Sequence, residues 1–148
     1  MPGQIPVIKV YDKLLVSVQI QMSDHLVQEL KEDITTAIEK HNPRGLMIEV
    51  SGVDILDSYI ARSIRDIAQI SKLMGVSTVV AGIDPSMAMT LVEMGMMLDG
   101  VSTCLSLEDA IDFLDDIHSQ KKQNLEDNMQ AVLASILDAD LQDQGKSS

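Results

Sequence analysis

The sequence contains few aromatic residues, one cysteine and no tryptophan. Only 2% of its 148 residues are aromatic while 45% are hydrophobic, so aliphatic side chains and methionine must fill the core. The single thiol, Cys104, excludes an internal disulfide and a zinc site built from several cysteines. We interpret Cys104 as a small core residue.

Long apolar runs and an excess of basic residues are also missing. No stretch approaches the ~20 apolar residues of a membrane-spanning helix, and the first five residues lack the pattern of a signal peptide. Eleven Lys and Arg against 23 Asp and Glu give a formal charge of −12, which repels phosphate backbones and anionic lipids. The sequence therefore predicts a cytoplasmic protein that binds neither nucleic acid nor membrane.

What is present is an alternation of strands and helices. Val7–Val10 and the run from Leu14 to Ile20 alternate apolar and polar residues with period two, which predicts an antiparallel hairpin. A helix is predicted over 24–41, capped by Ser23 or Asp24. Further strands are predicted over 46–50, 76–81 and 101–105, and further helices over about 58–74, 85–94 and 106–117. This order predicts an α/β fold with a mixed, mostly parallel sheet opened by the hairpin, four helices and an extra C-terminal helix.

The C-terminal region has a different composition. Residues 119–124 contain no apolar side chain and predict a linker. Beyond them, apolar residues between Leu125 and Leu137 form one stripe on a helix that cannot cover it alone, and residues 142–148 are expected to fray. We therefore divide the chain into a domain, 1–118, and a tail, 119–148, whose stripe must pack on its own domain or on a partner.

The loop after the strand 46–50 is the first candidate site, because parallel sheets present functional groups at the C-terminal ends of their strands. It places Ser58 at the start of the next helix, where the hydroxyl could cap the helix or carry a phosphoryl group that meets free backbone N–H groups. Asp54, Asp57 and Tyr59 flank it. Because the two carboxylates would repel added negative charge, we expect modification of Ser58 to change local shape or docking.

A second candidate loop, for a ligand or a partner, contains Gly82, Asp84 and Ser86. Asp84 is placed to cap the helix that begins with Pro85. Such a helix start could touch a nucleotide phosphate, although a tight turn with a cap explains the same residues.

Two other functions remain open at this point. Asp57 could be the phosphorylated residue of a receiver-like domain, although no acidic pair follows the first strand to bind Mg²⁺. The loop around Asp84 could belong to a small nucleotide-binding domain, although neither common glycine-rich phosphate motif is present. No base stands near Asp54 and Asp57, and the three histidines lack ligand spacing, so the residues predict no catalytic site and no metal site.

The residues from Ile5 to about Ile117 resemble the STAS domain of bacterial anti-sigma factor antagonists, and within that family the RsbS-like stressosome scaffolds. The resemblance is carried by the opening hairpin, by Val53–Ser58 before a helix, by Ser71–Gly75 and by Gly82–Pro85.

The resemblance implies a non-enzymatic domain without a cofactor, whose serine, Ser58 here, is phosphorylated by a cognate serine kinase. The unphosphorylated scaffold, assembled as an oligomer with sensor-bearing STAS paralogues, would hold that kinase, and phosphorylation would release it. The short segment before Ile5 favours a scaffold over a sensor-bearing paralogue.

Overall fold

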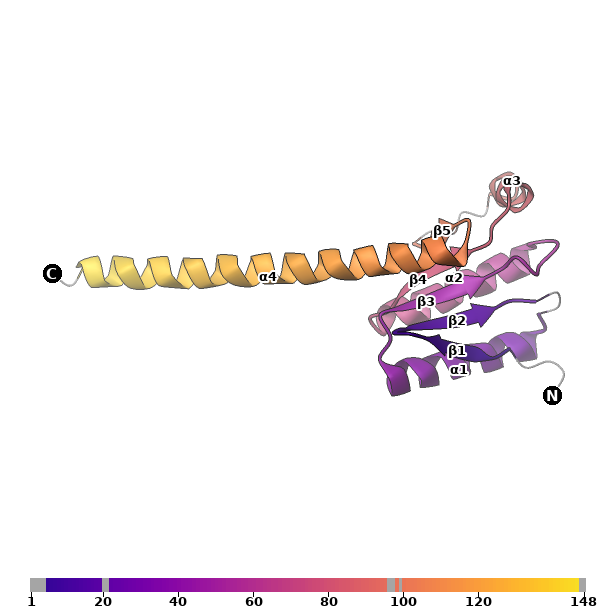
Figure 1. Ribbon diagram of the computed structural model, residues 1–148, viewed down its shortest axis with the longest axis horizontal. Coiled ribbons are helices and arrows are strands. Elements are labelled where there is room, and N and C mark those ends of the chain that lie inside the picture. Colours follow the sequence, from indigo (N-terminus) through magenta and orange to yellow (C-terminus); the bar gives the residue numbers. More distant parts are fainter. Residues whose placement is uncertain (1–4, 20–21, 96–97, 99, 147–148) are drawn as a thin grey trace. The chain divides into compact units, whose positions relative to one another are not determined.

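A five-stranded sheet organises the first part of the chain (Figure 1). The computed structural model describes residues 5–19, 22–95, 98 and 100–146, and the chain divides into two compact units, 1–114 and 115–148. The strands are β1 (Val7–Val10), β2 (Lys13–Ser17), β3 (Gly45–Glu49), β4 (Ser77–Ala81) and β5 (Ser102–Cys104), in that order across the sheet. β1 pairs antiparallel with β2, and all other neighbours are parallel.

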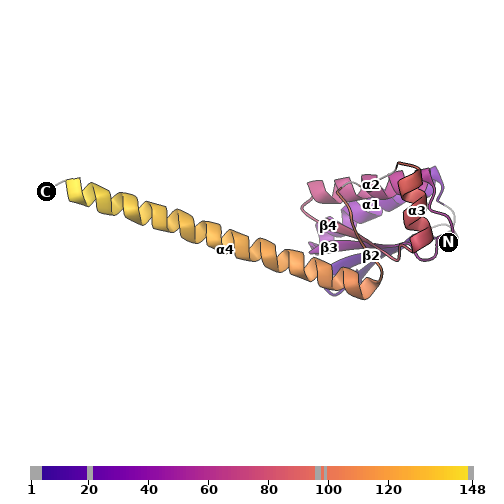
Figure 2. The same cartoon turned by 90° about the horizontal axis from the view of Figure 1, so that it is seen from above.

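Helices cover both faces of this sheet. α1 (Asp24–His41) and α2 (Ser58–Leu73) lie side by side over one face (Figure 2), because both connect neighbouring parallel strands in the same sense. α3 (Pro85–Glu93) follows β4, and α4 (Leu107–Lys146) begins against the opposite face. The central strands β2, β3 and β4 are therefore mostly buried between two layers, whereas β1 and β5 at the edges are partly exposed.

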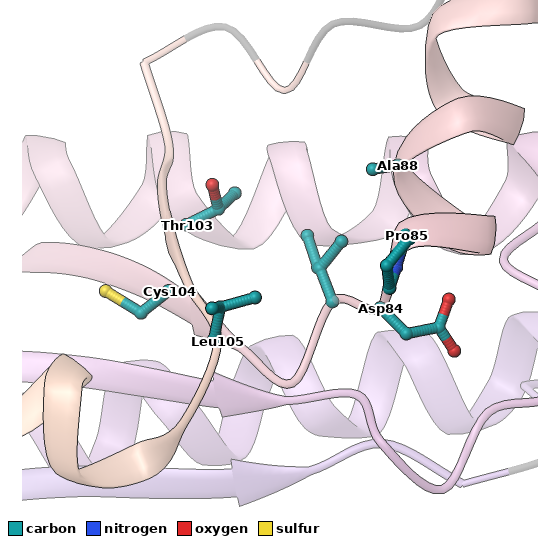
Figure 3. Close-up of a pocket in the computed structure, with 7 residues that line it drawn as sticks. Asp84, Pro85, Ala88, Thr103, Cys104 and Leu105 are labelled. Atoms are coloured by element: carbon teal, nitrogen blue, oxygen red, sulfur yellow. The ribbon is translucent and has the colours of Figure 1, made fainter.

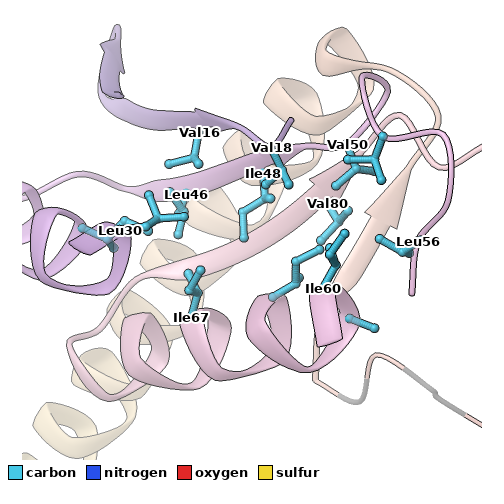
Figure 4. Packing of buried hydrophobic residues seen from close by; sticks show 14 of the residues in the cluster. Val16, Val18, Leu30, Leu46, Ile48, Val50, Leu56, Ile60, Ile67 and Val80 are labelled. Atoms are coloured by element: carbon cyan, nitrogen blue, oxygen red, sulfur yellow. The ribbon is translucent and has the colours of Figure 1, made fainter. Parts of the chain in front are cut away.

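The core divides according to the alternation of side chains along the strands. Leu14, Val16 and Val18 point to the face that α1 and α2 cover, where Leu30 and Ile67 pack against the sheet (Figure 4). On the other face Met47, Val79 and Ala81 meet the α4 residues Ala110 and Leu114. Fixed alternation thus directs neighbouring residues of one strand to different helices.

The predicted α/β fold is confirmed, including the opening hairpin and the parallel strands. The helix over 24–41 is confirmed with Ser23 as its cap, because the Ser23 hydroxyl accepts a hydrogen bond from the Leu26 backbone nitrogen at 3.2 Å. The predicted strand from Leu14 to Ile20 is shorter than expected: β2 ends at Ser17, and Ile20 lies outside the described residues.

The predicted linker at 119–124 is wrong. α4 continues through it from Leu107 to Lys146, and residues 142–146, which were expected to fray, are helical as well. Gln and Lys are good helix formers, and the segment contains no glycine or proline, so polarity alone does not end the helix. The boundary between the two units falls inside α4, after Leu114. That residues 1–118 and 119–148 act as separate functional parts stays a prediction.

Candidate functional site

The loop between β3 and α2 is held by two apolar anchors. Val53 and Leu56 are buried, and the Val53 nitrogen donates to the Val50 carbonyl at 3.0 Å to form a tight turn. Between these anchors the Ile55 side chain is 74% exposed. The loop therefore has a defined path and presents an apolar side chain to solvent.

Asp57, not Ser58, caps α2. The Asp57 carboxylate oxygen Oδ1 accepts a hydrogen bond from the Ile60 nitrogen at 2.8 Å, and its carbonyl accepts from the Ala61 nitrogen at 3.0 Å. The prediction that Ser58 caps the helix is wrong, because a cap needs an extended backbone, which Asp57 has (φ −81°, ψ 174°), whereas Ser58 is already the first helical residue.

Ser58 is exposed at this helix start. Within the described ranges no group forms a hydrogen bond with its hydroxyl. Asp54 and Asp57 are also exposed, whereas Tyr59 is half-buried, and a hydrogen bond to Asp24 raises the pKa of its phenol. The site thus combines an accessible hydroxyl with two flanking carboxylates.

Glu49, at the end of β3, joins three segments of this sheet edge. Its Oε2 accepts from the Ser17 hydroxyl at 3.2 Å, and its Oε1 accepts from the Ser51 nitrogen at 2.8 Å. A Cβ on Gly82 would lie 2.9 Å from Oε1, and Gly82 has a φ of +88°, so glycine is required for both space and conformation. Sequence reasoning missed Glu49, although an acidic residue ending an apolar strand was a usable signal.

The second candidate loop precedes α3. Asp84 caps that helix as predicted, with Oδ1 accepting from the Met87 nitrogen at 2.8 Å, whereas Ser86 is exposed in its first turn. Asp84 also lies beside a cavity of about 310 Å³, and Figure 3 shows the residues that line it. The lining residues are Ile83, Asp84, Pro85, Ala88, Thr103, Cys104 and Leu105.

This cavity does not favour a nucleotide. Its lining contains a carboxylate and no cationic side chain, and the Met87 N–H that could meet a phosphate already binds Asp84. Burial, with a smaller contribution from Asp109, raises the pKa of the Cys104 thiol, so the thiol is protonated at neutral pH. Gly82 and Ser86 are not among the residues that line the cavity.

The geometry also fails to support a receiver-like site at Asp57, because one oxygen of that carboxylate caps α2. Among the described residues, no group of three or more His, Cys, Asp or Glu side chains is placed to hold a metal ion. None of the helices in the described ranges is long and apolar enough to span a membrane.

Comparison with known proteins agrees with this architecture, since residues 4–110 match the STAS domain family. The chain belongs to that family. A solved structure of RsbS from Moorella thermoacetica, in a serine-to-glutamate variant, is 31% identical with a TM-score of 0.67, over 78% of this chain and 97% of that one. A chain from a structure of the stressosome, described as a signal integration and transduction hub, is 33% identical with the same TM-score, over 76% and 98%.

Longer relatives match as well. The RsbT co-antagonist protein RsbRA of Bacillus subtilis is 27% identical over 107 residues, which are 72% of this chain and 39% of RsbRA. The chain thus spans well under half the length of this relative. The present chain is a member of the STAS anti-sigma factor antagonist family, which consists of non-enzymatic signalling domains. It is related to the stressosome proteins RsbS and RsbR.

Proposed function

We propose that this chain is a phospho-switched scaffold of a cytoplasmic, stressosome-type signalling complex, which holds a serine kinase until Ser58 is phosphorylated. The observation that carries the proposal is the exposed Ser58 hydroxyl at the first residue of α2, with which none of the described residues forms a hydrogen bond. Similarity to RsbS and to a stressosome chain, over nearly the full length of both, supports the choice of complex.

Local electrostatics explains how phosphorylation could act as a switch. A phosphoryl group adds a charge of about −1.5 to −2 at neutral pH. On Ser58 this group would lie next to the Asp57 carboxylate, which already accepts the hydrogen bond of the Ile60 N–H. Asp54 is four residues away, in the loop before α2. Added charge therefore repels its neighbours instead of strengthening the cap, and it disturbs the loop that exposes Ile55. We propose this loop as the surface that holds the kinase.

The proposed partners follow from the relatives. RsbRA is named as a co-antagonist of RsbT, so we propose an RsbT-type serine kinase as the bound enzyme. Sensor-bearing STAS paralogues of the RsbR type are the proposed companions in a hetero-oligomer.

Phosphorylation of the full chain by a purified RsbT-type kinase with ATP tests the site. We expect intact mass and peptide mapping to find one phosphoryl group, on Ser58, which Ser58→Ala abolishes. Ser86→Ala is a matched control, because Ser86 is an exposed serine in the first turn of a helix that an aspartate also caps. Stoichiometric phosphate that persists on Ser58→Ala would contradict the assignment, and an alkali-labile phosphate on Asp57 would favour the receiver alternative.

Binding of the same kinase tests the switch separately. Ser58→Ala should bind like the unmodified chain, whereas Ser58→Asp should bind at least about tenfold more weakly, a difference of about 1.4 kcal/mol. Ser86→Asp adds the same charge outside the proposed surface and should leave the affinity unchanged. Equal affinities for Ser58→Ala and Ser58→Asp would exclude release by charge.

A further inference from the structure

The second unit, residues 115–148, presents an apolar surface that no other part of its described residues covers. Its described part is one continuous helix, the C-terminal portion of α4. Seven large apolar side chains on this helix are more than half exposed. One is Leu141, near the C-terminal end, and the other six are Leu125, Met129, Val132, Leu133, Ile136 and Leu137. Their spacing of three and four residues places them on one face, which we call the α4 stripe.

The two ends of the α4 stripe carry charged residues of opposite sign. Lys122 precedes Met129 by seven residues, and Asp140 follows Leu133 by seven. Because seven residues make almost two full turns, both charges lie in line with the stripe and not on the polar face of the helix. The stripe therefore has a positive N-terminal end and a negative C-terminal end.

We infer that the α4 stripe pairs with the same stripe of a second copy of this chain, in antiparallel orientation and centred level with Ala131. In this register Leu125 lies opposite Leu137 of the second copy, and Met129 lies opposite its Leu133.

Charge complementarity selects this occupant and this orientation. Antiparallel pairing about Ala131 places Lys122 opposite Asp140 at both ends of the interface. Parallel pairing would place Lys122 opposite Lys122 and Asp140 opposite Asp140, and like charges within an apolar seam are costly. The pairing is independent of Ser58, so it can fail or succeed whatever the outcome of the phosphorylation experiments.

Sedimentation equilibrium of the full chain, over a micromolar concentration series, tests the interface. We expect a dimer that Leu133→Glu weakens by at least about tenfold, because a carboxylate would be buried in the seam. Ala131→Glu adds the same charge on the opposite face of the helix and should have little effect. A monomeric full chain, or a dimer that Leu133→Glu does not weaken, would overturn the inference, and the former is the result expected if the stripe docks on its own chain.

Charge reversal tests the orientation. Lys122→Glu and Asp140→Lys should each weaken the dimer by several fold, and the double variant should restore it, because only antiparallel pairing brings the two exchanged charges together. Circular dichroism checks that each variant keeps its helix. Loss of affinity in the double variant equal to the sum of the two single losses would contradict antiparallel pairing.

Cysteine cross-linking gives an independent readout of register in a Cys104→Ser background. Leu125→Cys combined with Leu137→Cys should form disulfide-linked dimers on mild oxidation, whereas Leu125→Cys alone should not. Efficient disulfide-linked dimerisation of the single Leu125→Cys variant would indicate that the two helices are parallel and would overturn the proposed arrangement.

Discussion

At the residue scale, the Asp57 carboxylate stabilises the start of α2 through its 2.8 Å hydrogen bond to the Ile60 nitrogen. Asp57→Ala should lower the free energy of unfolding by about 1 kcal/mol, whereas Asp57→Asn, which keeps an acceptor oxygen, should cost less. Urea denaturation measures both. Asp54→Ala removes an exposed charge from the same loop without removing a cap and should change stability by less than about 0.5 kcal/mol. An equal loss in Asp54→Ala would show that loop charge, not capping, matters.

Also at the residue scale, Asp12 connects two basic side chains at the start of the sheet. Its carboxylate lies 2.8 Å from the Lys13 ammonium and 3.1 Å from the Arg44 guanidinium, and the Lys13 hydrogen bond is the main reason that the pKa of Asp12 is lowered below its ordinary value of 3.8. Because the folded pKa lies below the unfolded one, the stabilising contribution is present above the unfolded pKa and disappears as the pH falls through the folded one.

The Asp12→Asn variant isolates this contribution. The Asp12 side chain is 41% exposed, so solvent screens its ion pairs. We therefore expect Asp12→Asn to lower the free energy of unfolding at pH 7 by about 1 kcal/mol or less. The free energies of unfolding of the unmodified chain and of Asp12→Asn, measured by denaturant titration, should converge as the pH falls below about 4. A difference that stays constant down to pH 2 would attribute the effect to packing and not to charge.

At the scale of elements, the Leu114 side chain of α4 packs directly against Gly45 at the start of β3, in the space that a larger residue would need. A Cβ on Gly45 would lie 2.6 Å from Leu114 Cδ1, and Leu114 is 1% exposed. Leu114→Ala should destabilise the domain by about 2–5 kcal/mol through the cavity that it leaves. Gly45→Ala should also destabilise it, by forcing the Leu114 side chain to move.

The double variant provides the sharper measurement of this contact. Gly45→Ala should lower the free energy of unfolding less in a Leu114→Ala background than in the unmodified chain, because the added methyl group then enters the space that Leu114 has left. Leu105→Ala, at an exposed leucine just before α4, serves as the control with a small expected effect. Additive losses in the Gly45 and Leu114 variants would contradict direct contact between β3 and α4.

At the scale of the whole molecule, the formal charge of −12 opposes compactness. Ion pairs among the described residues, such as Lys31–Asp66 at 3.5 Å, are partly exposed, so each offsets little of this repulsion. Added NaCl should therefore raise the melting temperature, because screening weakens the repulsion more than it weakens the pairs. Differential scanning calorimetry from low to moderate salt measures the trend, and a falling melting temperature would mean that ion pairs dominate.

Sequence by itself determined the features that depend on short-range signals. The period-two runs of the hairpin, the Ser23 cap of α1 and the Asp84 cap of α3 could be predicted, because each involves residues at most a few positions apart. The prediction of a linker at 119–124 is wrong because it relied on polar composition, whereas the good helix formers in this segment continue α4. The candidate Ser58 could be located from its loop and from family resemblance, but its lack of a capping role could not.

Tertiary structure decided the remainder. Asp57 caps α2 instead of Ser58 because the burial of Val53 and Leu56 sets where the extended loop becomes helical. Glu49 organises the site edge through Ser17, 32 residues earlier, and through its closeness to Gly82 on the loop after β4. Such contacts depend on which strands become neighbours in the sheet, so they exist only after the chain has folded.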